Sequence, residues 1–237
     1  MNTSENFPMP ADTEYHEIDG LKIYLHHDDL PAEVYISFKG PVAVDCEMNR
    51  NLDHKKGKLC LAQFKAANSD INHLVKFNVD KKNNAPVLVH LLENPNYEKI
   101  FHFGRVDLAF LGYKLGATPR NIFCTRIASK MIRRDKIYAE DHSLKPLLKE
   151  YLGVEISKEE QCSMWENEVL TENQLKYAAL DVEYLHDLKA RLLPIAMMEK
   201  IDDLLYENCH FLETQIKNDL LGLPEDLFSY GTRRPKN

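Results

Sequence analysis

Two carboxylates close an apolar run near the start of the sequence. Asp45 and Glu47 end the segment PVAVDCE at residues 41–47. Because alternate residues of a β-strand point to the same side, a strand over this segment would place the two carboxylates side by side. Like charges at that spacing repel, so the pair must share a proton, face water or bind a divalent cation. A strand that has simply reached the surface is the alternative interpretation.

A third acid lies within a segment that is otherwise almost wholly apolar. Asp107 is the only acidic residue in FGRVDLAFLGYKL, residues 103–115, which the pattern predicts to be a buried helix. A buried carboxylate needs a partner. Arg105 could pair with it, although residues two apart on a helix do not face each other. A structural ion pair and a metal ligand both remain open for Asp107.

The fourth acid shares a predicted helix with a tyrosine. Asp181 ends the segment YAALD, and Tyr177 lies one turn before it. Apolar residues at helical spacing define the buried stripe of this helix: Leu175, Ala178, Val182, Leu185, Leu188 and Leu192. Asp181 projects within that stripe, so it is not an ordinary surface acid. A tyrosine hydroxyl that caps a buried aspartate is the structural alternative.

Taken together, Asp45, Glu47, Asp107 and Asp181 form an oxygen-only ligand set from one strand and two helices. Such a set favours Mg²⁺ or Mn²⁺, whereas zinc would draw on His and Cys at metal-binding spacing. Two divalent cations held close together can activate water and stabilise a phosphoryl group during in-line displacement. The residues therefore predict phosphodiester hydrolysis, with Tyr177 beside the metals.

The elements that must position these residues change in character along the chain. The first strand-like segments are joined by short polar turns, which predicts an antiparallel meander; they cover residues 21–25, 41–47, 58–64 and 71–79. A βα alternation and then helices follow; we expect a strand over 100–103 and helices over 85–92, 104–115, 125–131, 144–152, 172–193 and 195 to about 216. The predicted fold class is α/β, a mixed sheet flanked by helices.

Length and composition predict one folded domain. The chain has 237 residues, of which 44% are hydrophobic, and it shows no repeat or low-complexity tract. We expect a lead-in over residues 1–14, a single domain over 15–216 and a tail over 217–237. With no apolar run of membrane-spanning length and no signal peptide at its start, the protein is expected to be cytoplasmic, without a membrane partner.

Charge and cysteine usage exclude some functions. Five scattered cysteines with no CxxC pair indicate neither a disulfide framework nor a zinc knuckle. A net charge of −7 argues against a long basic groove for nucleic acid. A short anionic substrate held by a few local groups agrees with both observations.

The acidic motifs resemble those of a known enzyme family. DCE, HFGRVD and YAALD, in this order, resemble the three exonuclease motifs of the DEDDy 3′-5′ exonucleases, the RNase D-like class. The likeness extends through KLCLAQF, GVEISKEEQCSMW and LTENQLKYAALDVEYL, over residues 41–193. IFHFGRVDLAFL, IFCTRIASKMIRR, DHSLK and LLGLPEDLF are closer still to the compact bacterial nano-RNase C group.

This resemblance implies an RNase H-like (DnaQ-like exonuclease) fold and a metal-dependent 3′-5′ exonuclease. The nano-RNase C likeness implies hydrolysis of very short RNA, such as dinucleotides, to 5′-mononucleotides by a ring-shaped homo-octamer. The motifs imply that two divalent cations, Mg²⁺ or Mn²⁺, are bound by Asp45, Glu47, Asp107 and Asp181. Tyr177 would orient or help to deprotonate the attacking water, and its ordinary pKa near 10 favours orientation.

The resemblance also has two visible departures. Cys46 stands where a threonine is usual, and Met164 stands where an aspartate commonly precedes the tryptophan. Neither is a predicted ligand. Cys46 should point to the opposite face of its strand from Asp45 and Glu47, where packing is the expected role.

Five further residues are candidates for substrate contact. Leu52 could wedge between bases or simply pack within its loop. His102 and Phe103 could stack on or bond a terminal nucleotide, or pack at the end of a strand. His142 and Lys145, in the DHSLK segment, are candidates for phosphate contact.

Two other functions stay open at this point. The first is an RNase D-like exonuclease that trims longer RNA or degrades DNA, which the net charge of −7 disfavours. The second is a non-catalytic RNA- or nucleotide-binding module, which would have no chemical need for four acids and a tyrosine.

Overall fold

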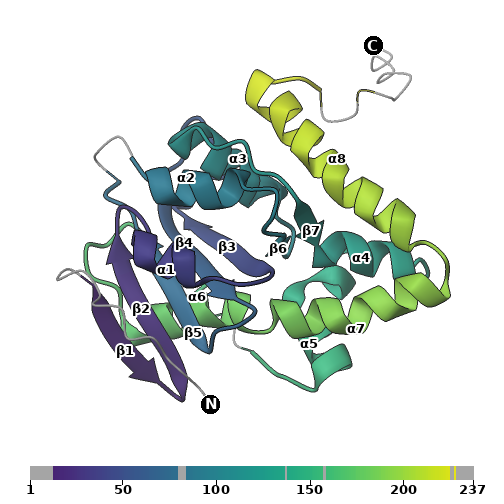
Figure 1. Ribbon diagram of the computed structural model, residues 1–237, viewed down its shortest axis with the longest axis horizontal. Helices are drawn as coiled ribbons and strands as arrows, with labels where there is room; N and C mark the ends of the chain where they lie inside the picture. Colours follow the sequence, from purple (N-terminus) through teal and green to yellow (C-terminus); the bar gives the residue numbers. More distant parts are fainter. Residues whose placement is uncertain (1–12, 80–83, 137, 157–158, 225–226, 228–237) are drawn as a thin grey trace, which may run out of the picture.

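The computed structural model describes residues 13–79, 84–136, 138–156, 159–224 and 227. Within them, one mixed sheet has the strand order β1-β2-β5-β4-β3-β6-β7 (Figure 1). The strands are β1 Glu14–Ile18, β2 Leu21–His27, β3 Val42–Met48, β4 Leu59–Ala66, β5 Ile71–Lys76, β6 Lys99–Phe101 and β7 Ile122–Cys124. The motif strand β3 lies between β4 and β6.

The predicted meander is correct for three strands and wrong for the first one. β3, β4 and β5 pair antiparallel in succession. β2 instead pairs in parallel with β5, on the far side of β4 from β3. Helix α1 (Ala32–Ser37) lies between β2 and β3 and carries the chain across. With only six residues and one buried side chain, α1 is too short to show a helical period in the sequence.

An edge strand was also missed by the sequence analysis. β1 pairs antiparallel with β2 across Asp19 and Gly20, whose φ values of 50° and 82° fit a tight hairpin turn. The turn was predicted, but β1 has the sequence EYHEI, which offers a single aliphatic residue. An edge strand that buries so little shows no apolar alternation.

Helices cover both faces of the sheet and one of its ends (Figure 1). Besides α1, the described helices are α2 Pro86–Glu93, α3 Arg105–Leu115, α4 Thr125–Ile132, α5 Leu144–Leu152, α6 Glu172–Glu183, α7 Leu185–Met198 and α8 Asp202–Leu221, with a 3₁₀ turn at Ala139–His142. α6 packs across β2, β5, β4 and β3 on one face, and α3 packs on the other. α4, α5, α7 and α8 gather beside β6 and β7.

Two predicted helix boundaries differ from the observed ones. The helix predicted over 172–193 is divided at Tyr184 into α6 and α7, and α7 then continues through Pro194. The last helix begins at Asp202 rather than at residue 195, because Lys200 has φ 57° and reverses the chain. The predicted gap between the two helices falls at Pro194, but a proline can be accommodated inside a helix at the cost of a hydrogen bond.

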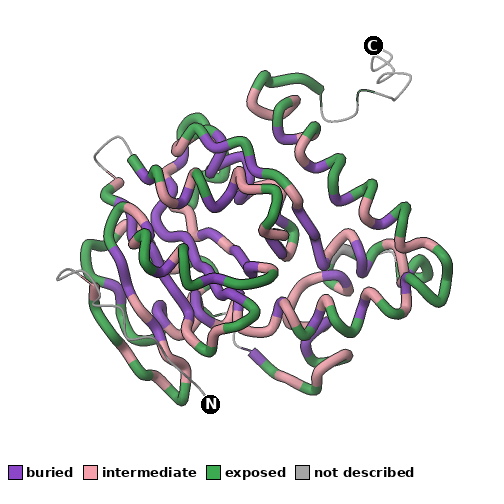
Figure 2. The backbone as a smooth tube through the Cα atoms, viewed as in Figure 1, coloured by how far each residue is buried: buried purple, intermediate pink, exposed green. Residues whose placement is uncertain are grey.

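The core runs along the central strands (Figure 2). All eight residues of β4 are buried, since helices lie on both of its faces. On one face Val44 and Cys46 contribute to the larger apolar cluster with α3, as expected for Cys46. The opposite face, under α6, carries the smaller apolar cluster and the acidic residues of β3. The predicted α/β class is confirmed.

Candidate active site

Strand β3 presents Asp45 and Glu47 on the face that α6 covers. Their cross-strand partners on β4 are Gln63 and Leu61, and opposite residues of an antiparallel pair share a face. The register shifts between Glu47 and Met48, so a β-bulge interrupts the ladder there before Met48 pairs with Leu59. Bulges are common beside functional sites, where they re-aim side chains.

Helix α3 brings Asp107 to the same end of the sheet. Asp107 lies in the first turn, where the helix dipole favours a carboxylate, and it is only 7% exposed. The chain enters α3 tightly: Phe103 has φ 62°, and a Cβ on Gly104 would lie 2.6 Å from the Phe101 side chain. The guanidinium of Arg105 makes a two-point ion pair with Asp219 of α8, at 2.8 Å for each contact.

Helix α6 carries Tyr177 and Asp181. It begins at a capping box in which Thr171 and Gln174 bond each other's backbone amides. Tyr177 and Asp181 lie one turn apart, and the tyrosine hydroxyl hydrogen-bonds to the Asp181 carboxylate. The Trp165 ring packs against Tyr177 with the ring centroids 6.0 Å apart. Trp165 is buried, as core packing predicts.

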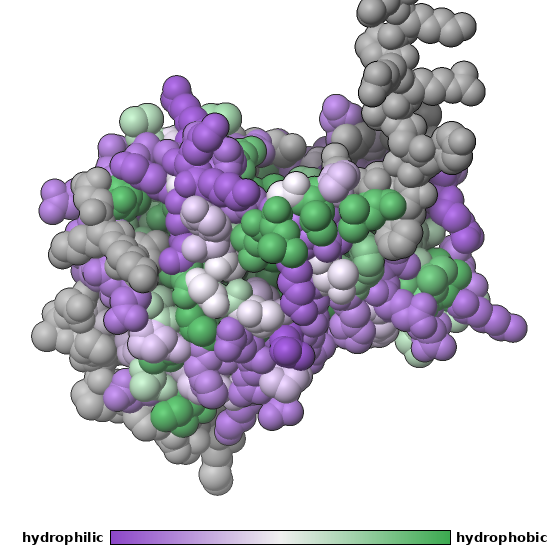
Figure 3. All heavy atoms as spheres, turned by 90° about the horizontal axis from the view of Figure 1, so that it is seen from above, coloured by the Kyte–Doolittle hydropathy of each residue, from purple (hydrophilic) through white to green (hydrophobic). Residues whose placement is uncertain are grey.

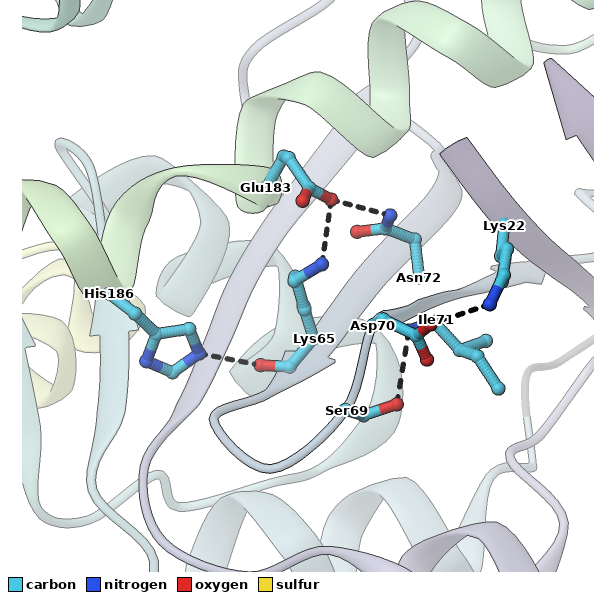
Figure 4. Close-up of polar contacts among 8 residues, drawn as sticks. All are labelled: Lys22, Lys65, Ser69, Asp70, Ile71, Asn72, Glu183 and His186. Carbon is cyan, nitrogen blue, oxygen red and sulfur yellow. Dashed lines mark hydrogen bonds and ion pairs between the residues drawn. The ribbon is translucent and has the colours of Figure 1, made fainter. Parts of the chain in front are cut away.

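The C-terminal end of α6 is fixed to the sheet by polar contacts (Figure 4). The Glu183 carboxylate accepts hydrogen bonds from Lys65 of β4 and Asn72 of β5, both at 2.8 Å. His186 of α7 bonds the carbonyl oxygen of Lys65 through Nε2 at 2.9 Å. Since Glu183 is two residues beyond Asp181, these contacts hold the end of α6 that carries Asp181 against the strands.

Three of the four predicted ligands meet directly. One carboxylate oxygen from each of Asp45, Glu47 and Asp181 lies within 4.8 Å of the other two. Asp107 is outside that group but close enough for its charge to act on Asp45 and Glu47. Segments from residues 45, 107 and 181 thus converge, as the sequence analysis predicted.

Simultaneous ionisation of the four carboxyl groups of this centre is unfavourable without a cation. Burial raises the pKa of Asp45 and Glu47 well above the usual range, and repulsion from Asp107 and Asp181 raises both further. Burial also raises the pKa of Asp107 to about 7, although backbone amides bond its carboxylate. A divalent cation would remove this repulsion, and an all-oxygen donor set fits Mg²⁺ or Mn²⁺.

Tyr177 is held in its neutral form. Burial raises its pKa above 10, and the neighbouring carboxylates of Asp181, Glu47 and Asp45 raise it further. At neutral pH the hydroxyl therefore keeps its proton and can orient a water molecule by hydrogen bonding. This environment makes the Tyr177 hydroxyl a weaker acid than free tyrosine, so the tyrosinate that could act as a base is scarcer at neutral pH.

Two predicted substrate residues lie exposed around two recesses of the surface. Leu52 is 62% exposed and lines both a recess of about 690 Å³, opposite Met164 and Trp165, and one of about 450 Å³. Phe103 is 50% exposed and lines the second recess. The Arg126 guanidinium covers one side of the Phe103 ring, 4.6 Å from its centroid.

The remaining predicted contacts differ in their surroundings. His102 bonds Thr125 Oγ1 through Nδ1 at 2.9 Å. His142 is buried, with Nδ1 2.8 Å from Ser129 Oγ and Nε2 3.0 Å from the carbonyl oxygen of Lys136. A phosphate contact from the His142 ring would require breaking one of these bonds. Lys145 is half-buried in the first turn of α5.

Gln63 and the Arg105–Asp219 pair are not among the residues predicted from the sequence. Gln63 is fully buried, directly opposite Asp45. A polar glutamine inside the apolar segment KLCLAQF was the available signal. Asp219 gave no comparable signal, because it falls in the part of the sequence taken for a tail.

Comparisons with known proteins agree with this geometry. Residues 27–196 match the family DNA_pol_A_exo1, described as a 3′-5′ exonuclease. Ribonuclease D of Desulfotalea psychrophila is 36% identical over 125 residues, 53% of this chain; the match spans about a third of that relative, 32%.

Solved structures extend the likeness to most of the chain. NrnC of Brucella melitensis bound to pGG is 38% identical, with a TM-score of 0.80, over 88% of this chain and 98% of that one. The Mg²⁺-bound form of the same protein is 36% identical, with a TM-score of 0.79, over 88% and 99%. RNase D of Escherichia coli, at 23% identity and a TM-score of 0.66 over 78% and 47%, shares the fold.

These structures confirm the predicted RNase H-like fold. The family match covers well over half of the sequence and includes Asp45, Asp107 and Asp181. The chain therefore belongs to the 3′-5′ exonuclease family, as a metal-dependent, RNase D-like DEDDy enzyme similar to NrnC.

Proposed function

We propose that this protein is a two-metal-ion 3′-5′ exoribonuclease that hydrolyses very short RNA, such as dinucleotides, to 5′-mononucleotides. The observation that carries the proposal is the pair of recesses that meet at Leu52, one of which is lined by Arg105 and Val106 in the first turn of the helix that carries Asp107. Recesses of this size suit one or two nucleotides better than a long strand. The similarity over nearly the full length of NrnC, solved with pGG, supports the same substrate class.

In this proposal, Asp45, Glu47, Asp107 and Asp181 hold two divalent cations, Mg²⁺ or Mn²⁺. Bound there, the cations would lower the pKa of the attacking water and stabilise charge on the scissile phosphate. Tyr177 donates or accepts a hydrogen bond to align that water, since its raised pKa keeps it protonated. The Trp165 ring and the Glu183 contacts keep Tyr177 and Asp181 in place.

Substrate recognition is assigned to the exposed apolar groups. Leu52 lines both recesses and would wedge between two bases, and the exposed part of the Phe103 ring would stack on a base. His102 and Lys145 remain proposed contacts of the substrate. His142 acts indirectly, because its carbonyl oxygen accepts a hydrogen bond at 3.0 Å from Arg126, which stacks on Phe103.

A length series tests this substrate assignment. Purified protein with Mn²⁺ or Mg²⁺ is given 5′-labelled RNA of two, three, five, seven and twenty nucleotides, with a DNA duplex alongside. We expect rapid conversion of the dinucleotide and slow attack on the twenty-mer. Comparable trimming of the long RNA or the DNA would instead favour the general RNase D-like exonuclease.

We also propose that the protein assembles with copies of itself, as the ring-shaped octamer implied by the nano-RNase C resemblance. Large apolar side chains are exposed at the end of α7 and along α8, including Met197, Met198, Leu204 and Leu221. Figure 3 shows hydrophobic groups gathered near the middle of the face seen from above, with others scattered among hydrophilic ones. Light scattering at micromolar protein is expected to give an oligomeric mass, and a monomeric mass would contradict the proposal.

Three expectations about the whole protein stay predictions. They are the division at residues 1–14, 15–216 and 217–237, the cytoplasmic location and the lack of a membrane partner. Among the described residues, none of the helices has the length and apolar character that crossing a bilayer requires. The described elements extend slightly beyond the predicted domain, since β1 begins at Glu14 and α8 ends at Leu221.

A further inference from the structure

Gln63 is a buried polar residue that the proposed mechanism does not use. It lies in the middle of β4, its side chain is fully buried, and neither amide atom has a hydrogen-bond partner among the described residues. A buried amide left without a partner has lost its hydrogen bonds to water and gained none in return, which destabilises the folded state. A residue kept in such a position needs an explanation beyond packing.

The neighbours of Gln63 leave few candidates for a partner. On its own strand the adjacent side chains of the same face are Leu61, which is apolar, and Lys65, which is bound to Glu183. Across β5 the opposite residue is Leu74, also apolar and buried. Helix α6, which covers this face, contributes the buried side chains of Ala178 and Ala179 and the Asp181 carboxylate, which already accepts a hydrogen bond from Tyr177.

Across β3, the residue directly opposite Gln63 is Asp45. Side chains opposite each other in an antiparallel pair have their Cβ atoms about 4.5–5.5 Å apart. The Gln63 amide makes no hydrogen bond to Asp45 in this structure, but rotation of its side chain could bring Nε2 to the carboxylate without any movement of the backbone. In the described part of the chain, Asp45 is thus the residue directly opposite Gln63 that offers an acceptor to its amide. Asn72 of β5, whose Oδ1 also has no partner, is two residues from Leu74 and therefore a diagonal, more distant neighbour.

We infer that Gln63 is a positioning residue: its Nε2 donates a hydrogen bond to the Asp45 carboxylate and holds it in the orientation that binds the divalent cation. The inference rests on the proposed role of Asp45 as a metal ligand. An ionised carboxylate is a stronger acceptor than a neutral one, so the bond is charge-assisted when the cation is bound. Partners of this kind orient ligands and commonly affect metal affinity by about 10–100-fold.

The test is Gln63→Met, which keeps the length of the side chain and removes both amide groups. Binding of Mn²⁺ alone is measured by electron paramagnetic resonance of the free ion. We expect the Kd for Mn²⁺ to rise by about tenfold or more. In EDTA the Tm should be unchanged or higher, because a buried amide has been replaced by an apolar group. Gln63→Leu serves as a second apolar replacement.

A role confined to packing predicts the reverse pattern. If Gln63→Met lowers the Tm in EDTA while the Kd for Mn²⁺ is unchanged, the inference is wrong. Leu74→Met is the matched control, since it alters the other cross-strand neighbour of Gln63 and should leave the Kd unchanged. kcat/KM of Gln63→Met should fall at low Mn²⁺ and recover at high Mn²⁺, a dependence that a packing defect would not produce.

Asp45→Asn, measured in the same binding assay, separates this inference from the proposed function. If Asp45→Asn weakens Mn²⁺ binding but Gln63→Met does not, only the positioning role of Gln63 is refuted. If Asp45→Asn leaves Mn²⁺ binding unchanged, the proposed metal site fails and the inference fails with it.

Discussion

Asp45→Asn is expected to lower kcat for dinucleotide hydrolysis by at least about a thousandfold, which corresponds to roughly 4 kcal/mol of lost transition-state stabilisation. The substitution keeps the shape of the side chain but removes the charge that draws a cation to the centre of the acidic group. The fold should survive, because an amide replaces a carboxylate whose ionisation burial already disfavours. Initial rates at saturating Mn²⁺, with circular dichroism of both proteins, measure the effect.

The matched control is Asp70→Asn, the same substitution at a surface residue. Asp70 pairs with Lys22 at 2.6 Å, and its side chain is 72% exposed. Its kcat should stay within about twofold of the unmodified protein, since surface pairs contribute little. If the unmodified protein binds RNA but shows no metal-dependent turnover for Asp45→Asn to abolish, the non-catalytic binding module is the better assignment.

The acidic centre could be predicted because each piece is visible over a few residues. A two-residue alternation places Asp45 and Glu47 on one face, and the helical period places Asp181 within an apolar stripe. Their meeting depends on β3, α3 and α6 converging, which no local pattern encodes. For that step the resemblance to the DEDDy family supplied the answer, and the described geometry agrees with it for Asp45, Glu47 and Asp181.

What could not be predicted depends on partners distant in the sequence. The parallel pairing of β2 with β5 requires the crossing through α1, whose six residues show no period. The pairing of Arg105 with Asp219 joins residues 114 positions apart. Gln63 becomes informative only when the β3–β4 register places it opposite Asp45.

The environment of His142 shows that a predicted substrate contact also depends on burial, which the sequence does not reveal. A histidine and a lysine close together in DHSLK predict phosphate contacts by type, but residue type does not show burial. The fold places the His142 ring between Ser129 and the Lys136 carbonyl, where both nitrogens are engaged. The sequence left a packing role open for Leu52 and Phe103, but in the fold both are exposed and line a recess.

Asp107→Asn is expected to change stability in opposite directions with and without metal. Burial raises the pKa of Asp107 from 3.8 to about 7, so the folded state holds this proton more tightly than the unfolded state. Without metal, the free energy of unfolding must then fall as pH rises from about 4 to about 7. Asparagine carries no such proton, so at pH 8 in EDTA the Tm of Asp107→Asn should exceed that of the unmodified protein.

At pH 8 in EDTA the difference in Tm between Asp107→Asn and the unmodified protein should reach several degrees, since 1 kcal/mol corresponds to about 2–4 °C in Tm for a chain of this size. At pH 5 it should shrink, because the unmodified protein is then protonated at Asp107. With saturating Mn²⁺ at pH 8 the order should reverse, because only the unmodified protein retains all four acids and gains the full stabilisation of ligand binding. Scanning fluorimetry at both pH values, with EDTA or Mn²⁺, gives all four comparisons.

The opposite result in EDTA would identify a different role for Asp107. If Asp107→Asn lowers the Tm at pH 8 without metal, the carboxylate of Asp107 in the unmodified protein is stabilised by a positive partner. The structural ion pair would then be the better interpretation of Asp107. Arg105→Lys then separates the partners, since lysine cannot reproduce the two-point contact with Asp219. If Arg105 pairs only with Asp219, Arg105→Lys should show the same pH dependence of Tm as the unmodified protein. If Arg105 pairs with Asp107, the substitution should abolish that pH dependence.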